Sequence, residues 1–148
     1  MPAIIHEYLL SQVEKRIGLA GPGWRTQRNS SIARDQGLQP DLSVMGPDSQ
    51  RLIVEVCCSN LDYDAKNILI EAAIPHIDHL IAVTPDKTTM RKLQDTLKKN
   101  AEDPDGDWQK TITLLDAARC LADNFDWPKV LSYSKRKLFG EKETDQSN

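Results

Sequence analysis

The chain has 148 residues, of which 39% are hydrophobic and 28% are charged, with a formal net charge of −3. This length suits one domain with its own core, no apolar run reaches the ~20 residues that cross a bilayer, and acids near the start argue against a signal peptide. Three cysteines without CxxC spacing predict reduced thiols, so we expect a cytoplasmic protein, and its acidic balance means that any nucleic-acid contact must rest on local clusters of Lys and Arg.

The first predicted element is a helix over residues 3–17, in which Ile4, Tyr8 and other apolar residues recur at helical spacing. Gly18 and the GPG that follows are expected to end it. The next segment, residues 24–33 (WRTQRNSSIA), is polar with some strand character and predicts an exposed edge strand.

A β-hairpin is predicted next, with arms at 38–45 and 51–58 joined by the turn sequence GPDSQ. Residues 62–73 predict a helix capped by Asn60 or Asp62. The continuous apolar run that follows, HLIAVT, is typical of a buried parallel strand reached by a right-handed helical crossover.

The remaining elements are a helix over 88–101 with a Thr88 cap, an exposed EDPDGD loop, a strand over 110–115 and a short helix over 116–125. The order predicts an α/β fold, a mixed β-sheet flanked by helices. We expect a single domain over 1–131 and a polar C-terminal tail over 132–148.

Each arm of the hairpin carries one carboxylate, Asp41 and Glu55. In an antiparallel ladder, facing residues have a constant sum of positions, and a turn centred on Asp48 makes that sum 96, which Asp41 and Glu55 also satisfy. The two acids are therefore expected to face each other, an arrangement that a divalent cation, Mg²⁺ or Mn²⁺, would relieve. A plain ion pair of Glu55 with Arg25 or Arg28 would relieve it too.

The residues Pro40-Asp41 and Glu55-Val56-Cys57 resemble the motif of the PD-(D/E)XK nuclease superfamily, and the predicted element order over residues 3 to 85 resembles its restriction-endonuclease-like core, helix-strand-strand-strand-helix-strand. The resemblance implies that Asp41 and Glu55 bind Mg²⁺ or Mn²⁺ with an acid from the first helix, for which Glu7 is the first choice and Glu14 the second.

Cys57 departs from the motif, because the family has a lysine there that positions or activates the attacking water. A thiol is mostly neutral at pH 7 and cannot supply that positive charge. Lys66 on the following helix could reach the same space as a catalytic lysine, or Ser59 or Asn60 could orient a water. Otherwise the site is degraded.

Two functions follow as expectations. The first is a metal-dependent nuclease that hydrolyses DNA phosphodiester bonds, with Arg25, Arg28, Lys87 and Arg91 on the DNA backbone. The alternative is a catalytically inactive nuclease fold that serves as a DNA-binding or protein-interaction module, with a homodimer as a further expectation. A small-molecule-binding α/β domain has less support, since the chain lacks a Gly-rich phosphate loop.

Overall fold

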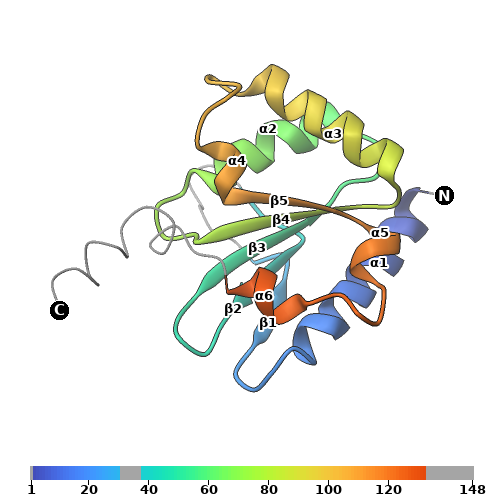
Figure 1. Ribbon diagram of the computed structural model, residues 1–148, viewed down its shortest axis with the longest axis vertical. Helices are drawn as coiled ribbons and strands as arrows, with labels where there is room; N and C mark the ends of the chain where they lie inside the picture. Colours follow the sequence, from blue (N-terminus) through green and yellow to red (C-terminus); the bar gives the residue numbers. More distant parts are fainter. Residues whose placement is uncertain (1, 31–37, 133–148) are drawn as a thin grey trace, which may run out of the picture.

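A five-stranded mixed β-sheet covered by helices on both faces is the framework of the computed structural model (Figure 1), which describes residues 2–30 and 38–132. The predicted α/β class is therefore confirmed. The last three residues of the predicted edge strand and nearly all of the predicted tail lie outside the described residues. The strands are β1 (Arg25–Arg28), β2 (Leu42–Met45), β3 (Arg51–Val56), β4 (His79–Thr84) and β5 (Ile112–Asp116).

The strands lie side by side in the order in which they occur in the chain. The first three form an antiparallel meander, whereas β3, β4 and β5 run parallel. β3 and β4 pair in parallel, which confirms the predicted crossover between them. A short hairpin turn joins antiparallel strands only, so it could not connect this pair. At the outer edge, β1 has only four residues, and Asn29, which follows it, has a positive φ of 53°.

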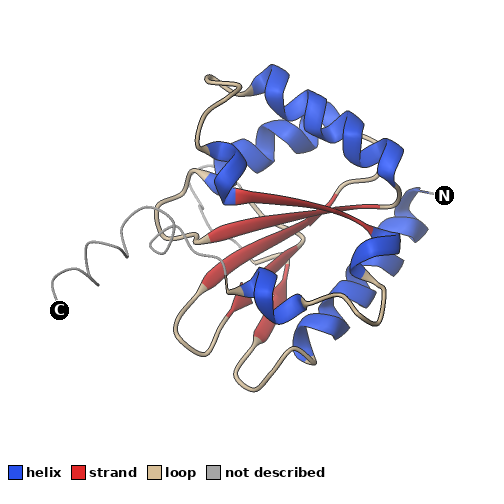
Figure 2. Ribbon diagram, viewed as in Figure 1, coloured by secondary structure: helices blue, strands red, loops and turns tan. Residues whose placement is uncertain are grey.

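Helices occupy both sides of the sheet, as Figure 2 shows. Their bounds are α1 (Pro2–Gly18), α2 (Leu61–Ala72), α3 (Lys87–Asn100), α4 (Trp108–Thr111), α5 (Ala117–Cys120) and α6 (Trp127–Leu131). No helix within the described ranges is both long and apolar enough to traverse a membrane. All three cysteines are free, as expected.

One face of the sheet packs against α1, α5 and α6. The period of two along β3 directs Leu52, Val54 and Val56 to this face, where they join Leu9 and Val13 of α1 in a continuous core.

The opposite face carries a second core under α2 and α3, and it involves only part of the sheet. Ile53 of β3 and Cys57, just after it, share this core with Ala65 and Ile68 of α2, and every member of the core lies in β3 or later in the chain. Within residues 2–30 and 38–132, the same face of β1 and β2 therefore has no helical cover.

Three sequence expectations about the later elements need correction. The cap of α3 is Asp86, whose side chain accepts a hydrogen bond from the Thr89 amide, and not Thr88. The segment 116–125 is helical only over α5, which Asp116 caps. The short helix α6 has no counterpart among the predicted elements, and Trp127 at its start is buried and donates its indole N–H to the Cys120 carbonyl.

Candidate active site

The hairpin register brings Asp41 and Glu55 together, as the sum rule predicts. The last ladder pair is Leu42 with Val54, so the next residues outward on the two arms are Asp41 and Glu55. The turn that sets this register closes through a 2.9 Å hydrogen bond from the Gly46 amide to the Gln50 carbonyl. The Asp41 amide donates to Glu55 Oε1 over 2.8 Å, which confirms their juxtaposition directly.

The Asp41 carboxylate is held on two sides. Its Oδ2 accepts a 2.8 Å hydrogen bond from the amide of Val56, the residue after Glu55. The same oxygen lies 3.1 Å from His6 Nε2 on α1. Backbone of β3 and a side chain of α1 together fix this carboxylate at the mouth of the site, where it keeps 23% of its side-chain surface exposed.

Behind Glu55 lies a second glutamate, Glu71 of α2, which is only 1% exposed. Burial first, then the hydrogen bond with Glu71 and the charges of Glu71 and Asp41 raise the pKa of Glu55 to about 11. Burial also raises the pKa of Glu71. Glu55 is therefore protonated at neutral pH, and the two glutamates share a proton instead of carrying two charges.

Glu71 has one oxygen without a partner. Its Oε1 is buried and makes no hydrogen bond within the described part of the chain. Burial of an acceptor without a donor costs free energy, on the order of 1–3 kcal/mol. A buried acceptor without a donor, within a cluster of acids, lowers the stability of the fold. Such unfavourable groups are typical of functional sites.

Asp64, in the first turn of α2, completes the acidic cluster. Burial and the charge of Asp41 raise the pKa of Asp64 to about 6, against smaller opposing effects of the Cys57 thiol and His6. Burial is also the main cause that raises the pKa of Cys57, and the charges of Asp64, Glu55 and Asp41 add to it. Cys57 is thus a neutral thiol that faces three acids.

A cavity of about 460 Å³ opens over this cluster. Asp41, Glu55 and Asp64 line it from the hairpin and α2, and His6 lines it from α1. Further polar groups come from the loop after β3 and from α2, namely Ser59, Asn60, Tyr63 and Asn67. Ser59 and Asn60 are therefore at the site, as one of the sequence alternatives requires.

The acid predicted from α1 is not part of this cavity. Glu7 pairs with Arg28 of β1, which also contacts Glu14 at 3.0 Å. Hydrogen bonding to Arg28 lowers the pKa of Glu7. Glu7, the metal ligand predicted from the first helix, therefore lies outside the cavity, and His6 is the α1 side chain that reaches Asp41.

Arg28 is likewise engaged elsewhere. Its guanidinium donates to Glu7, Glu14 and Ser11 on α1, so the structure gives no ion pair of Glu55 with Arg28. Two carboxylates already neutralise this arginine, which reduces its value as a contact for a DNA backbone.

Lys66 is not at the cavity either. It is exposed on α2 and lines a separate depression of about 960 Å³ with Leu69, Ile70 and the loop before α4. One face of α2 turns to the carboxylates and carries Asp64, Asn67 and Glu71, which are three and four residues apart. Lys66 does not follow this spacing and therefore lies on a different face of the helix.

The other predicted nucleic-acid contacts lie at two ends of the sheet. Lys87 and Arg91 are exposed in the first turns of α3, which begins just after the carboxyl end of β4. Because β4 runs parallel to β3, this is the end at which Glu55 lies. Arg25 pairs in register with Met45, near the hairpin turn and hence toward the opposite end.

The side chains of this cavity are of the chemical type that binds a hard divalent cation. Carboxylate oxygens from Asp41, Glu55 and Asp64, with the unpartnered Oε1 of Glu71 behind them, are the ligands that Mg²⁺ and Mn²⁺ prefer. Over residues 2–30 and 38–132, no three acidic, His or Cys side chains form a preassembled metal site. Cation binding would therefore require protons to leave and side chains to adjust.

Sequence reasoning missed three residues of the site: His6, Asp64 and Glu71. One signal for Glu71 existed, because it lies three residues after Ile68 and next to Ala72, within the apolar stripe of α2. An acid in an apolar stripe needs a partner, and the partner is Glu55. His6 carried no comparable signal.

Relatives offer no guide to this site. Comparison with protein-family models, curated proteins and solved structures finds no match for the chain. The geometry and electrostatics of the cluster itself therefore indicate what the protein does.

Proposed function

We propose that this protein is a divalent-cation-dependent phosphodiesterase that acts on DNA and has a restriction-endonuclease-like fold. The observation that carries the proposal is the paired Asp41 and Glu55 at the end of the hairpin, joined by a 2.8 Å hydrogen bond and backed by the buried Glu71. The helix, antiparallel meander, helix and parallel strand from α1 to β4 support the fold, because they follow the order that the motif resemblance implies.

In this proposal Asp41, Glu55 and Asp64 hold Mg²⁺ or Mn²⁺. A bound cation of this kind supplies Lewis-acid stabilisation of a phosphoryl oxygen and lowers the pKa of water. The protein itself would hold the ligating carboxylates in position. The Val56 amide orients Asp41 through Oδ2, and no hydrogen bond within the described residues occupies its Oδ1. Glu55 must release its proton, which Glu71 is placed to accept.

His6 is the chain's own candidate for proton transfer. When Nε2 carries the hydrogen and donates to Asp41 Oδ2, Nδ1 keeps its lone pair and can accept a proton. A base fixed by a carboxylate in this way typically contributes about 10²–10⁴-fold to a rate. His6 would therefore do part of the work that the family assigns to its motif lysine.

The test of the proposal is hydrolysis by the purified full chain. Supercoiled, linear and branched DNA should be cut in Mn²⁺ or Mg²⁺ and remain intact in EDTA. Failure to cut any of these substrates in either metal would rule the proposal out in favour of the non-catalytic alternative.

His6 and Lys66 make opposite predictions. We expect His6→Ala to slow cleavage about 100-fold, because it removes the base beside Asp41. Lys66→Ala should leave the rate within about twofold, because the lysine lines a different cavity. Single-turnover cleavage measures both, and a larger loss for Lys66→Ala than for His6→Ala would show that the helix lysine reaches the substrate.

The non-catalytic alternative, a DNA-binding or protein-interaction module, has one specific observation in its favour. Cys57 stands in the motif lysine position as a fully buried, neutral thiol, and no lysine lines the carboxylate cavity among the described residues. Phosphoryl transfer without that positive charge is slower. The alternative predicts DNA binding without hydrolysis.

A substitution at Cys57 separates the two functions. Cys57→Lys places an ammonium among the charges of Asp64, Glu55 and Asp41, and we expect cleavage about tenfold faster than wild type, since a fixed cation stabilises the transition state. Cys57→Met, of similar length and without charge, is the control. If Cys57→Lys cuts DNA and the wild type does not, the result would support the non-catalytic alternative, in which the natural site is degraded. Equal slowing by Lys and Met in folded proteins would contradict the expectation.

A further inference from the structure

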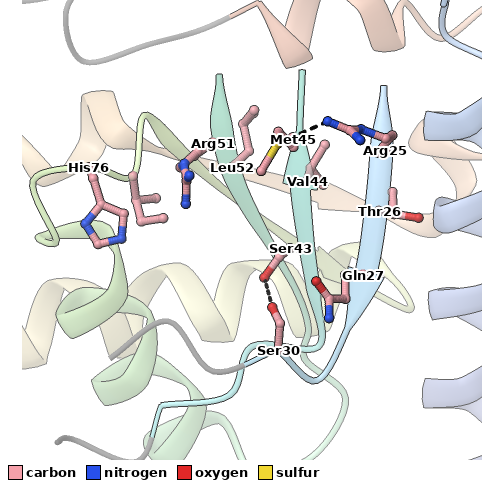
Figure 3. A pocket seen from close by; sticks show the side chains of 11 residues that line it. Arg25, Thr26, Gln27, Ser30, Ser43, Val44, Met45, Arg51, Leu52 and His76 are labelled. Carbon is pink, nitrogen blue, oxygen red and sulfur yellow. Dashed lines mark hydrogen bonds between the residues drawn. The ribbon is translucent and has the colours of Figure 1, made fainter. Parts of the chain in front are cut away.

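A second polar cavity lies on the face of β1 and β2 that the α2/α3 layer does not cover. It has a volume of about 540 Å³, and we call it the basic groove. Its principal polar side chains are Arg25, Gln27, Ser43, Arg51 and His76. Figure 3 shows Arg25 on one side of the groove, and Arg51 and His76 on the other.

Strand register explains why these residues share a face. Arg25 pairs with Met45, and Met45 pairs with Arg51, so the three form a row across β1, β2 and β3. Along β3, the period of two puts Arg51 on the same face as Ile53 and Glu55. The groove and the carboxylate site therefore lie at two ends of one face of the sheet, where α2 covers Ile53 of β3 but no described helix covers β1 and β2.

The charge of the groove is unbalanced. Arg25, Arg51 and His76 are exposed, and no described residue that lines the groove is acidic. Neither the Arg25 nor the Arg51 guanidinium forms an ion pair within the described residues, in contrast to Arg28. The carboxylate of Asp78 accepts a 3.0 Å hydrogen bond from the Arg51 amide but forms no ion pair with its guanidinium. A patch in which exposed cations outnumber acids is complementary to a polyanion, even on a chain of net charge −3.

We infer that the basic groove binds the phosphodiester backbone of a nucleic-acid strand that extends from the carboxylate site. This inference rests on the proposed function for its substrate class. At a strand rise of about 3.3 Å, Arg51 lies about 13 Å from Glu55 along β3. That distance corresponds to about four nucleotides at 3.4 Å per nucleotide along a duplex axis. Ser43 and Gln27 provide hydrogen-bonding groups between the cations.

The test is binding of fluorescein-labelled duplex and single-stranded DNA in EDTA, followed by fluorescence anisotropy over a range of salt. Arg25→Ala/Arg51→Ala should weaken binding by about tenfold or more and reduce the slope of log affinity against log salt by about 2. Lys98→Ala/Lys99→Ala is the matched control, because it removes two positive charges from the far end of α3. Arg25→Lys/Arg51→Lys should retain the slope.

The outcomes separate this inference from the proposed hydrolysis. If Arg25→Ala/Arg51→Ala loses no more affinity for DNA than Lys98→Ala/Lys99→Ala, the inference that the basic groove binds DNA is wrong, even if the wild type cuts DNA. If the wild type binds DNA through Arg25 and Arg51 but never cuts it, the proposed hydrolysis is wrong and the inference about the basic groove stands. Thermal unfolding verifies that each variant is folded, which we expect since both arginines are exposed.

Discussion

Asp41→Asn and Glu55→Gln should each reduce Mn²⁺-dependent DNA cleavage by on the order of 100-fold or more. Both replacements are nearly isosteric and keep an oxygen that can accept the hydrogen bonds from the Val56 and Asp41 amides. They remove only the negative charge that would hold the cation. Gel-based single-turnover rates measure the loss, and calorimetric titration with Mn²⁺ alone should show weaker binding by both variants.

Glu102→Gln supplies the control for this prediction. Glu102 is an exposed acid in the loop before α4, so its replacement changes the net charge by the same amount without touching the site. Its rate should equal that of the wild type. If Asp41→Asn cuts as fast as Glu102→Gln, the hairpin carboxylates are not the site of hydrolysis.

Glu55→Gln should also make the protein more stable at neutral and alkaline pH. The ordinary pKa of a glutamate, 4.5, applies to Glu55 in the unfolded chain, whereas folding raises the pKa of Glu55 to about 11. Between these values the folded chain holds a proton that the unfolded chain has released, so stability falls as pH rises through this window. Glutamine has no proton to lose. The stability gap between variant and wild type should therefore widen from pH 5 to pH 9.

The expected gap at pH 9 is on the order of a few kcal/mol, or roughly 2–4 °C of melting temperature per kcal/mol. Thermal unfolding followed by circular dichroism in EDTA measures it, with Glu102→Gln again as the control. Glu71→Gln should act in the same direction, because burial raises the pKa of Glu71 as well. A gap that stays constant or narrows with pH would refute the protonated glutamate pair. We therefore expect Glu55 to lower the stability of the fold while it contributes to activity.

The hairpin is predictable in detail because local chemistry determines it. The GPDSQ turn fixes the register, and the register alone places Asp41 against Glu55. The buried strand β4 spans the same residues that the sequence predicts, since a continuous apolar run leaves few alternatives.

The remainder of the site depends on how helices rotate against the sheet. Glu7 and His6 are neighbours in the chain, and only the packing of α1 decides that His6 reaches Asp41 while Glu7 turns to Arg28. On α2 the same consideration separates Glu71, which faces the carboxylates, from Lys66, which does not. Helical spacing in the sequence gives relative directions on a helix but not its absolute orientation.

The short edge strand β1 also affects how the protein behaves among copies of itself. An open strand edge invites pairing with other chains, and proteins discourage this with brevity and charge. β1 offers four residues, two of them arginines on opposite faces. A strand from another molecule would find too short a ladder to extend the sheet, so the surface that we assign to a polyanion also opposes self-association into fibres.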